Sequence, residues 1–120
     1  MGELVVIKDG QPTVIKSDKC RNLSGHTEYP VDLFLRKVLP ENNYRLGKVA
    51  EDEYFGVNFV FFREKKPSLP LGCLATRGAA GYVELWVFRS GKSLIEEIIG
   101  MLEVYSRKFG NVTLNIYENY

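Results

Sequence analysis

The feature that most constrains the fold of this 120-residue chain is an amphipathic segment near its C-terminal end. Ser93-x-x-Glu96 has the pattern of a helix-capping box, and Gly110 stands where helices commonly end in the left-handed conformation. Between them, one apolar stripe recurs at helical spacing: Leu94, Ile98, Met101, Leu102, Tyr105 and Phe109. The pattern predicts a helix over residues 93–109. Because such a helix must bury its stripe, the rest of the chain must supply an apolar surface.

Strand-like alternation in residues 44–90 supplies that surface. Four strands fit this region as an antiparallel meander, with turns at 51–53, 65–70 and 78–81. Successive side chains of a strand point to opposite faces. One face then carries Phe55, Val57, Phe59, Val83, Leu85 and Val87, and the other carries Tyr54, Asn58, Phe62, Tyr82, Trp86 and Phe88. We expect the helix to cover the first face and to leave the second accessible.

The remaining elements complete one α+β domain over residues 1–120. Residues 4–16 form a predicted hairpin around Asp9-Gly10, and 112–117 a last strand. A short helix is expected over 30–39, opened by Pro30 and ended by Pro40. The fold prediction is therefore an antiparallel meander sheet of about four to five strands, with a short N-terminal helix and a long C-terminal helix packed on one face.

Composition excludes several classes of function. The single histidine, His26, and the distant pair Cys20 and Cys73 give no metal-ligand spacing and no set of catalytic imidazoles, so we expect no metal, no cofactor and no enzyme activity. No window reaches the roughly 18 apolar residues of a membrane span, and residues 1–8 lack a secretion signal. These patterns favour a cytoplasmic protein without membrane contact. A formal net charge of +1 excludes a strongly basic, histone-like protein.

The Gly91-Lys92-Ser93 sequence ends like a phosphate-binding loop between a strand and a helix. Trp86 stands where that loop requires a glycine, so the sequence does not indicate nucleotide hydrolysis. A turn followed by a helix cap explains the same residues. The free N–H groups of the helix start, with Arg89 and Lys92, could still hold one phosphate of a bound strand.

The second sheet face combines rings with nearby cations. Rings beside cations on an open sheet are typical of proteins that bind single-stranded nucleic acid, because stacked bases and neutralised phosphates need no sequence readout. The candidate binding residues are Tyr54, Phe62, Tyr82, Trp86 and Phe88 for stacking, and Arg63, Lys65, Lys66, Arg77, Arg89 and Lys92 for phosphates. The same residues also fit ordinary core aromatics beside a solvated loop. A third interpretation is a protein-interaction module or homodimer that uses the aromatic face.

The order of elements resembles the archaeal single-stranded DNA-binding proteins called ThermoDBP and their relatives. The resemblance is architectural and covers the helix at 30–39, the strands within 44–90 and the helix at 93–109, about two thirds of the chain. It implies helices on one side of the sheet and largely sequence-independent DNA binding on the other side. The hairpin at 4–16 and the near-neutral charge depart from that family.

Overall fold

A computed structural model describes residues 2–8, 10–15, 29–52, 56–62, 71–77, 81–88 and 92–118 of the chain. These residues form seven strands and two helices. In chain order the elements are β1 (Leu4–Lys8), β2 (Gln11–Ile15), α1 (Val31–Glu41), β3 (Arg45–Asp52), β4 (Gly56–Phe62), β5 (Gly72–Arg77), β6 (Tyr82–Val87), α2 (Lys92–Lys108) and β7 (Val112–Tyr117).

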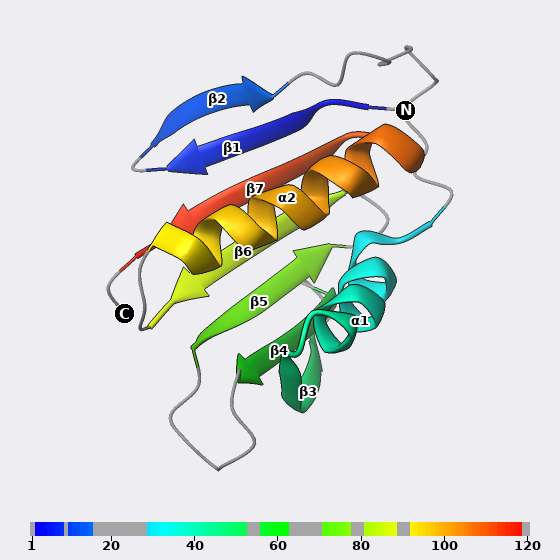
Figure 1. The fold of residues 1–120 in the computed structure, drawn as a ribbon, viewed down its shortest axis with the longest axis vertical. Helices are drawn as coiled ribbons and strands as arrows, with labels where there is room; N and C mark the ends of the chain where they lie inside the picture. The colour runs from blue at the N-terminus through cyan, green and yellow to red at the C-terminus, as the bar shows by residue number, and fades with distance from the viewer. Residues whose placement is uncertain are drawn as a thin grey trace.

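All seven strands belong to one mixed sheet, in the order β2-β1-β7-β6-β5-β4-β3 (Figure 1). β7 runs parallel to both of its neighbours, β1 and β6, and the remaining neighbours are antiparallel. The predicted sheet of four to five strands, all antiparallel, is therefore wrong, although the four strands β3 to β6 do form an antiparallel meander. The hairpin joins the sheet, and the last strand is inserted between the hairpin and the meander.

The length of α2 explains why β7 is parallel to β6. Parallel neighbours need a long crossover, whereas antiparallel ones need only a turn. With 17 residues, α2 spans about 25 Å and returns the chain to the end of the sheet where β6 begins. Thr113 then pairs with Tyr82, and Tyr117 with Trp86. The amphipathic segment is thus the connection that makes the sheet mixed.

Both helices lie on the same face of the sheet (Figure 1). The predicted alternation of β6 is confirmed on this side, where Val83, Leu85 and Val87 are buried. Other buried strand residues on this face are Leu4, Val6, Leu74, Val112, Leu114 and Ile116. The helices add Val31, Leu35, Leu39, Ile98, Leu102 and Tyr105 to the same core. The hydrophobic core therefore occupies the layer between sheet and helices.

The end of α1 departs from expectation, because Pro40 lies inside the helix instead of ending it. A proline in the last turn removes one N–H donor, but the chain closes the turn by other bonds. The Tyr44 N–H donates to the Leu39 carbonyl over 2.9 Å, and the Asn42 amide Nδ2 donates to the Val38 carbonyl over 2.8 Å. Asn43 reverses the chain with a φ of 67°, in the left-handed region that asparagine tolerates.

Candidate nucleic-acid interface

The sheet face opposite the helices, called the open face below, carries the candidate site. None of the described elements lies over it, because every described strand is in the sheet and both helices are on the other side (Figure 1). Strand register places these described side chains on the open face: Val5, Ile7, Cys73, Ala75, Arg77, Tyr82, Glu84, Trp86, Thr113, Asn115 and Tyr117. Arg77 is exposed, and the others are half-buried. The face therefore presents side-chain surface to solvent across its central strands.

A stacked aromatic pair lies at the centre of the open face. Trp86 and Tyr117 are register partners on β6 and β7. Their ring centroids are 4.4 Å apart and their planes are inclined by 23°. This separation is close to the spacing of neighbouring strands, so the two rings extend the sheet geometry outward as a stack. The two half-buried rings thus form one aromatic surface on the open face.

A polar network holds the neighbouring side chains. The Asn115 Nδ2 donates to the Tyr117 hydroxyl over 3.0 Å and to the Tyr82 hydroxyl over 3.3 Å. The Tyr82 hydroxyl in turn donates to Glu84 Oε1 over 3.2 Å. Burial raises the pKa of Tyr82, and the nearby Glu84 carboxylate adds to this effect, so its phenol stays protonated at neutral pH. The network thus fixes Tyr117, one member of the stacked pair.

Small side chains border Trp86 on its other flank. Cys73 is the register partner of Trp86 on β5, and Ala75 follows on the same face beside Glu84. Burial raises the pKa of the Cys73 thiol, so the neutral thiol predominates at neutral pH. The flank away from Tyr117 is therefore lined, on β5, by small and uncharged side chains.

The structure brings together only part of the predicted site. Trp86, Tyr82 and Arg77 share the open face, and Arg77 pairs with Tyr82 where β5 and β6 meet. Phe88 follows β6 and is half-buried, with its N–H bonded to the Leu71 carbonyl. Phe62 ends β4, two strands away from β6, and pairs with Arg45.

Six of the predicted binding residues are not among the described residues of the open face. Lys92 opens α2, whose backbone belongs to the helical layer on the opposite side of the sheet. The other five lie outside the described residues: Tyr54, Arg63, Lys65, Lys66 and Arg89. Arg77 is thus the one predicted cation that the described part of the chain places on the open face.

The sequence interpretation missed Tyr117 and Asn115. Alternation in 112–117 does place these residues on one face of a strand. The alternation pattern does not show where that strand lies in the sheet. The strand β7 lies beside β6 through a parallel pairing, which the expected antiparallel meander does not contain. A rule that treats the long helix as a crossover between parallel strands would have placed Tyr117 beside Trp86.

No protein-family model, no curated protein and no solved structure is significantly similar to the chain. The resemblance to ThermoDBP proteins therefore stays a prediction.

Among the described residues no cluster of three or more His, Cys, Asp or Glu side chains could hold a metal ion, and neither described helix is long and apolar enough to cross a membrane.

Proposed function

We propose that the open face binds single-stranded nucleic acid, with bases stacked against Trp86 and Tyr117. The observation that carries this proposal is the stacked pair itself, half-buried at the centre of a sheet face with no described element over it. Every base has a flat π-face, so a stacking platform accepts bases with little regard to their identity. The small side chains of Cys73, beside Trp86, and of Ala75, beside Glu84, leave room for a base next to the stacked pair.

The charges of the open face make this binding modest in strength. Arg77 is exposed at one end of β5, where it can neutralise a phosphate of a strand that crosses Tyr82. Glu84, on the same face, repels phosphates but can accept a hydrogen bond from a base amino group. Further phosphate contacts from Arg63, Lys65, Lys66 and Arg89 remain predictions from the sequence, as does any contact from Lys92.

The test is the anisotropy of a fluorescein-labelled oligonucleotide of about 15 nucleotides, long enough for one binding site. Loss of one stacked base costs about 1–3 kcal/mol, so Trp86→Ala and Tyr117→Ala should each weaken binding roughly 5- to 150-fold. Leu33→Ala is the matched control, because Leu33 is 46% exposed on α1, on the other side of the sheet. Equal affinities for all four proteins would contradict the proposal.

One observation favours a second candidate, a protein interface on the same face. The Glu84 carboxylate lies among the central rings, where it suits a polar protein partner or a second copy better than a polyanion. Sedimentation of the chain with and without oligonucleotide distinguishes the two candidates. A stable dimer that does not bind oligonucleotide, and that dissociates when Trp86 is replaced in Trp86→Ala, would support this second function.

A further inference from the structure

A carboxylate lies at the centre of the open face, where a surface that binds a polyanion is expected to carry none. Among the described strand residues of the open face, Glu84 is the one acidic side chain. It is half-buried on β6, two residues before Trp86 and on the same face. Its charge repels any phosphate that approaches. The carboxylate therefore weakens the binding of a nucleic-acid strand unless the strand gives it a hydrogen-bond donor.

A chain of hydrogen bonds holds the Glu84 carboxylate near the stacked pair. The Asn115 Nδ2 donates to the Tyr82 hydroxyl over 3.3 Å, and this hydroxyl donates to Glu84 Oε1 over 3.2 Å. A phenol has a single proton to donate, and the bond from Asn115 directs that proton to Glu84. Glu84 and Asn115 are also register partners across β6 and β7. The carboxylate is thus positioned before any ligand binds, which lowers the entropy cost of binding.

The neighbours of Glu84 supply it with one donor. The Tyr82 hydroxyl is its one hydrogen-bond partner within the described part of the chain, and it uses one of about four acceptor positions of the carboxylate. Both N–H groups of the Asn115 amide are directed at the Tyr82 and Tyr117 hydroxyls. Ala75, the register partner on β5, has a methyl side chain without a donor. The carboxylate therefore keeps acceptor positions that a ligand can use.

Guanine is the base whose donors match a carboxylate best. Its Watson–Crick edge carries the N1–H beside the N2 amino group, so both can donate to the two oxygens of one carboxylate. Adenine and cytosine each offer one amino group beside a ring nitrogen that accepts hydrogen bonds. Thymine offers one N–H between two carbonyl oxygens. In these three bases an acceptor atom faces the negative charge, so a carboxylate discriminates in favour of guanine.

Resting on the nucleic-acid binding proposed above, we propose that the open face prefers guanine and that Glu84 selects it. The guanine ring lies next to the stack of Trp86 and Tyr117, in the room left by Cys73 and Ala75 on β5. Its N1–H and N2 amino group donate to the Glu84 carboxylate. Stacking provides binding to any base, and the carboxylate adds a preference for one of them.

The test compares DNA strands that differ in one amino group. A fluorescein-labelled thymidine strand of about 15 nucleotides is bound to the full chain at low salt, and unlabelled strands of equal length displace it, followed by anisotropy. The competitors are a thymidine strand, an alternating thymine–guanine strand and the same strand with inosine for guanosine. Inosine keeps the purine ring for stacking and lacks the N2 amino group. We expect the guanine strand to bind about tenfold more tightly than the inosine strand, because one hydrogen bond to a charged group is lost.

Two variants with the same change of charge locate the preference. Glu84→Gln keeps the size of the side chain and should lower the preference for guanine over inosine to less than about twofold. The same variant should bind the thymidine strand at least as tightly as the wild-type chain, because a repelling charge is gone. Glu96→Gln, at an exposed residue of α2 on the other side of the sheet, should keep the preference at about tenfold. A merely structural role of Glu84 would instead weaken the binding of all strands alike.

Equal displacement by the guanine and inosine strands, from a chain that binds the thymidine strand, would overturn the guanine preference and leave the nucleic-acid binding intact. Absence of binding by every strand would overturn the proposed function and the preference together. A preference that persists in Glu84→Gln would overturn the role of Glu84. If that variant does not fold, the comparison of the guanine and inosine strands on the wild-type chain still decides the preference.

Discussion

At the residue scale, two glycines meet opposite surroundings. A Cβ atom on Gly2 would lie 2.2 Å from the Asn111 backbone nitrogen and 2.3 Å from the Gly110 carbonyl carbon, whereas Gly100 has open space. The close approach at Gly2 accompanies a hydrogen bond of 2.6 Å from its N–H to the Ser106 carbonyl. Of these two glycines, Gly2 is therefore the one that packing requires.

This contrast predicts opposite effects of one substitution. Gly100→Ala should raise the free energy of unfolding by about 1 kcal/mol, because alanine favours the helix and meets no neighbour. Gly2→Ala should lower it by about 1–3 kcal/mol, because the backbone of Asn111 must move. Urea unfolding of both variants measures the two changes. A loss of stability in Gly100→Ala would show that α2 packs more closely than described.

The raised pKa of Cys73 predicts slow alkylation of the native chain near neutral pH. Burial disfavours the thiolate, the reactive form, and so raises the pKa of Cys73; at a given pH the native thiol should therefore react more slowly than an exposed one. The pKa of Cys73 is higher in the folded chain than in the unfolded chain. The protonated thiol therefore contributes its full share to the free energy of unfolding below the unfolded pKa, and this contribution is lost as pH rises through the folded pKa.

Iodoacetamide alkylation rates from pH 7 to pH 10 check this expectation, with Cys20→Ser to leave a single thiol. The urea-unfolded chain is the control. Equal rates for native and unfolded chain at pH 8 would show that Cys73 is neither buried nor shifted.

At the scale of elements, β7 has a central role. It pairs with β1 on one side and β6 on the other, and its Leu114 is fully buried beneath the helices. We predict that Leu114→Ala lowers the free energy of unfolding by about 2–5 kcal/mol. Val14→Ala on the edge strand β2, where Val14 is 48% exposed, should change it by at most about 0.5 kcal/mol. Similar losses in the two variants would contradict the central position of β7.

Local patterns predict the elements better than their arrangement. The stripe of α2 and the alternation of β6 are properties of neighbouring residues, so the sequence indicates which side of each is buried. The position of β7 depends on pairs such as Val5 with Thr113, more than a hundred residues apart, which no local pattern encodes. For the same reason Tyr117 could not be assigned to the site, whereas Trp86 could.

The end of α1 shows a second limit. A proline is read as a helix stop because it lacks a donor. Pro40 is tolerated in the last turn because Asn42, Asn43 and Tyr44 together close the helix. That compensation depends on three later residues and on the left-handed conformation of Asn43.

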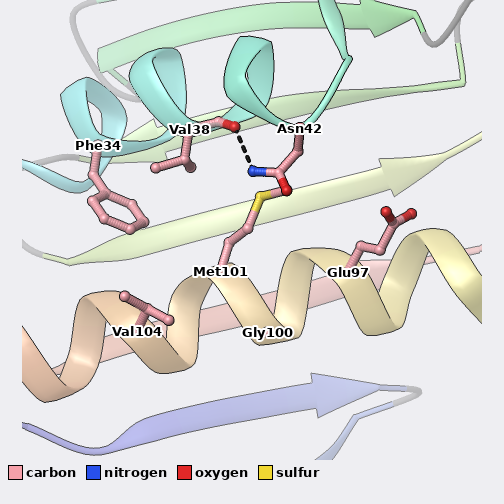
Figure 2. Close-up of a pocket in the computed structure, with 7 residues that line it drawn as sticks. All are labelled: Phe34, Val38, Asn42, Glu97, Gly100, Met101 and Val104. Atoms are coloured by element: carbon pink, nitrogen blue, oxygen red, sulfur yellow. Dashed lines mark hydrogen bonds between the residues drawn. The ribbon is translucent and has the colours of Figure 1, made fainter.

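At the scale of the whole molecule, the two layers separate two surfaces. The open face lies on the outside of the sheet, and a groove lined by residues of α1 and α2, Met101 among them, lies in the helical layer (Figure 2). Because the core separates the two surfaces, a substitution in the groove should leave binding on the open face unchanged. We predict that Met101→Ala changes oligonucleotide affinity by less than about twofold, measured by anisotropy. A larger change would show that the groove and the open face are coupled.

The most direct test of the central claim uses the only tryptophan, Trp86, as its own reporter. Its emission is titrated with an unlabelled oligonucleotide of about 15 nucleotides at low salt. Binding on the open face predicts saturable quenching that is reversed as salt is raised, because phosphate contacts release counterions. Emission that stays unchanged at low salt over the whole titration would contradict nucleic-acid binding by the Trp86–Tyr117 stack.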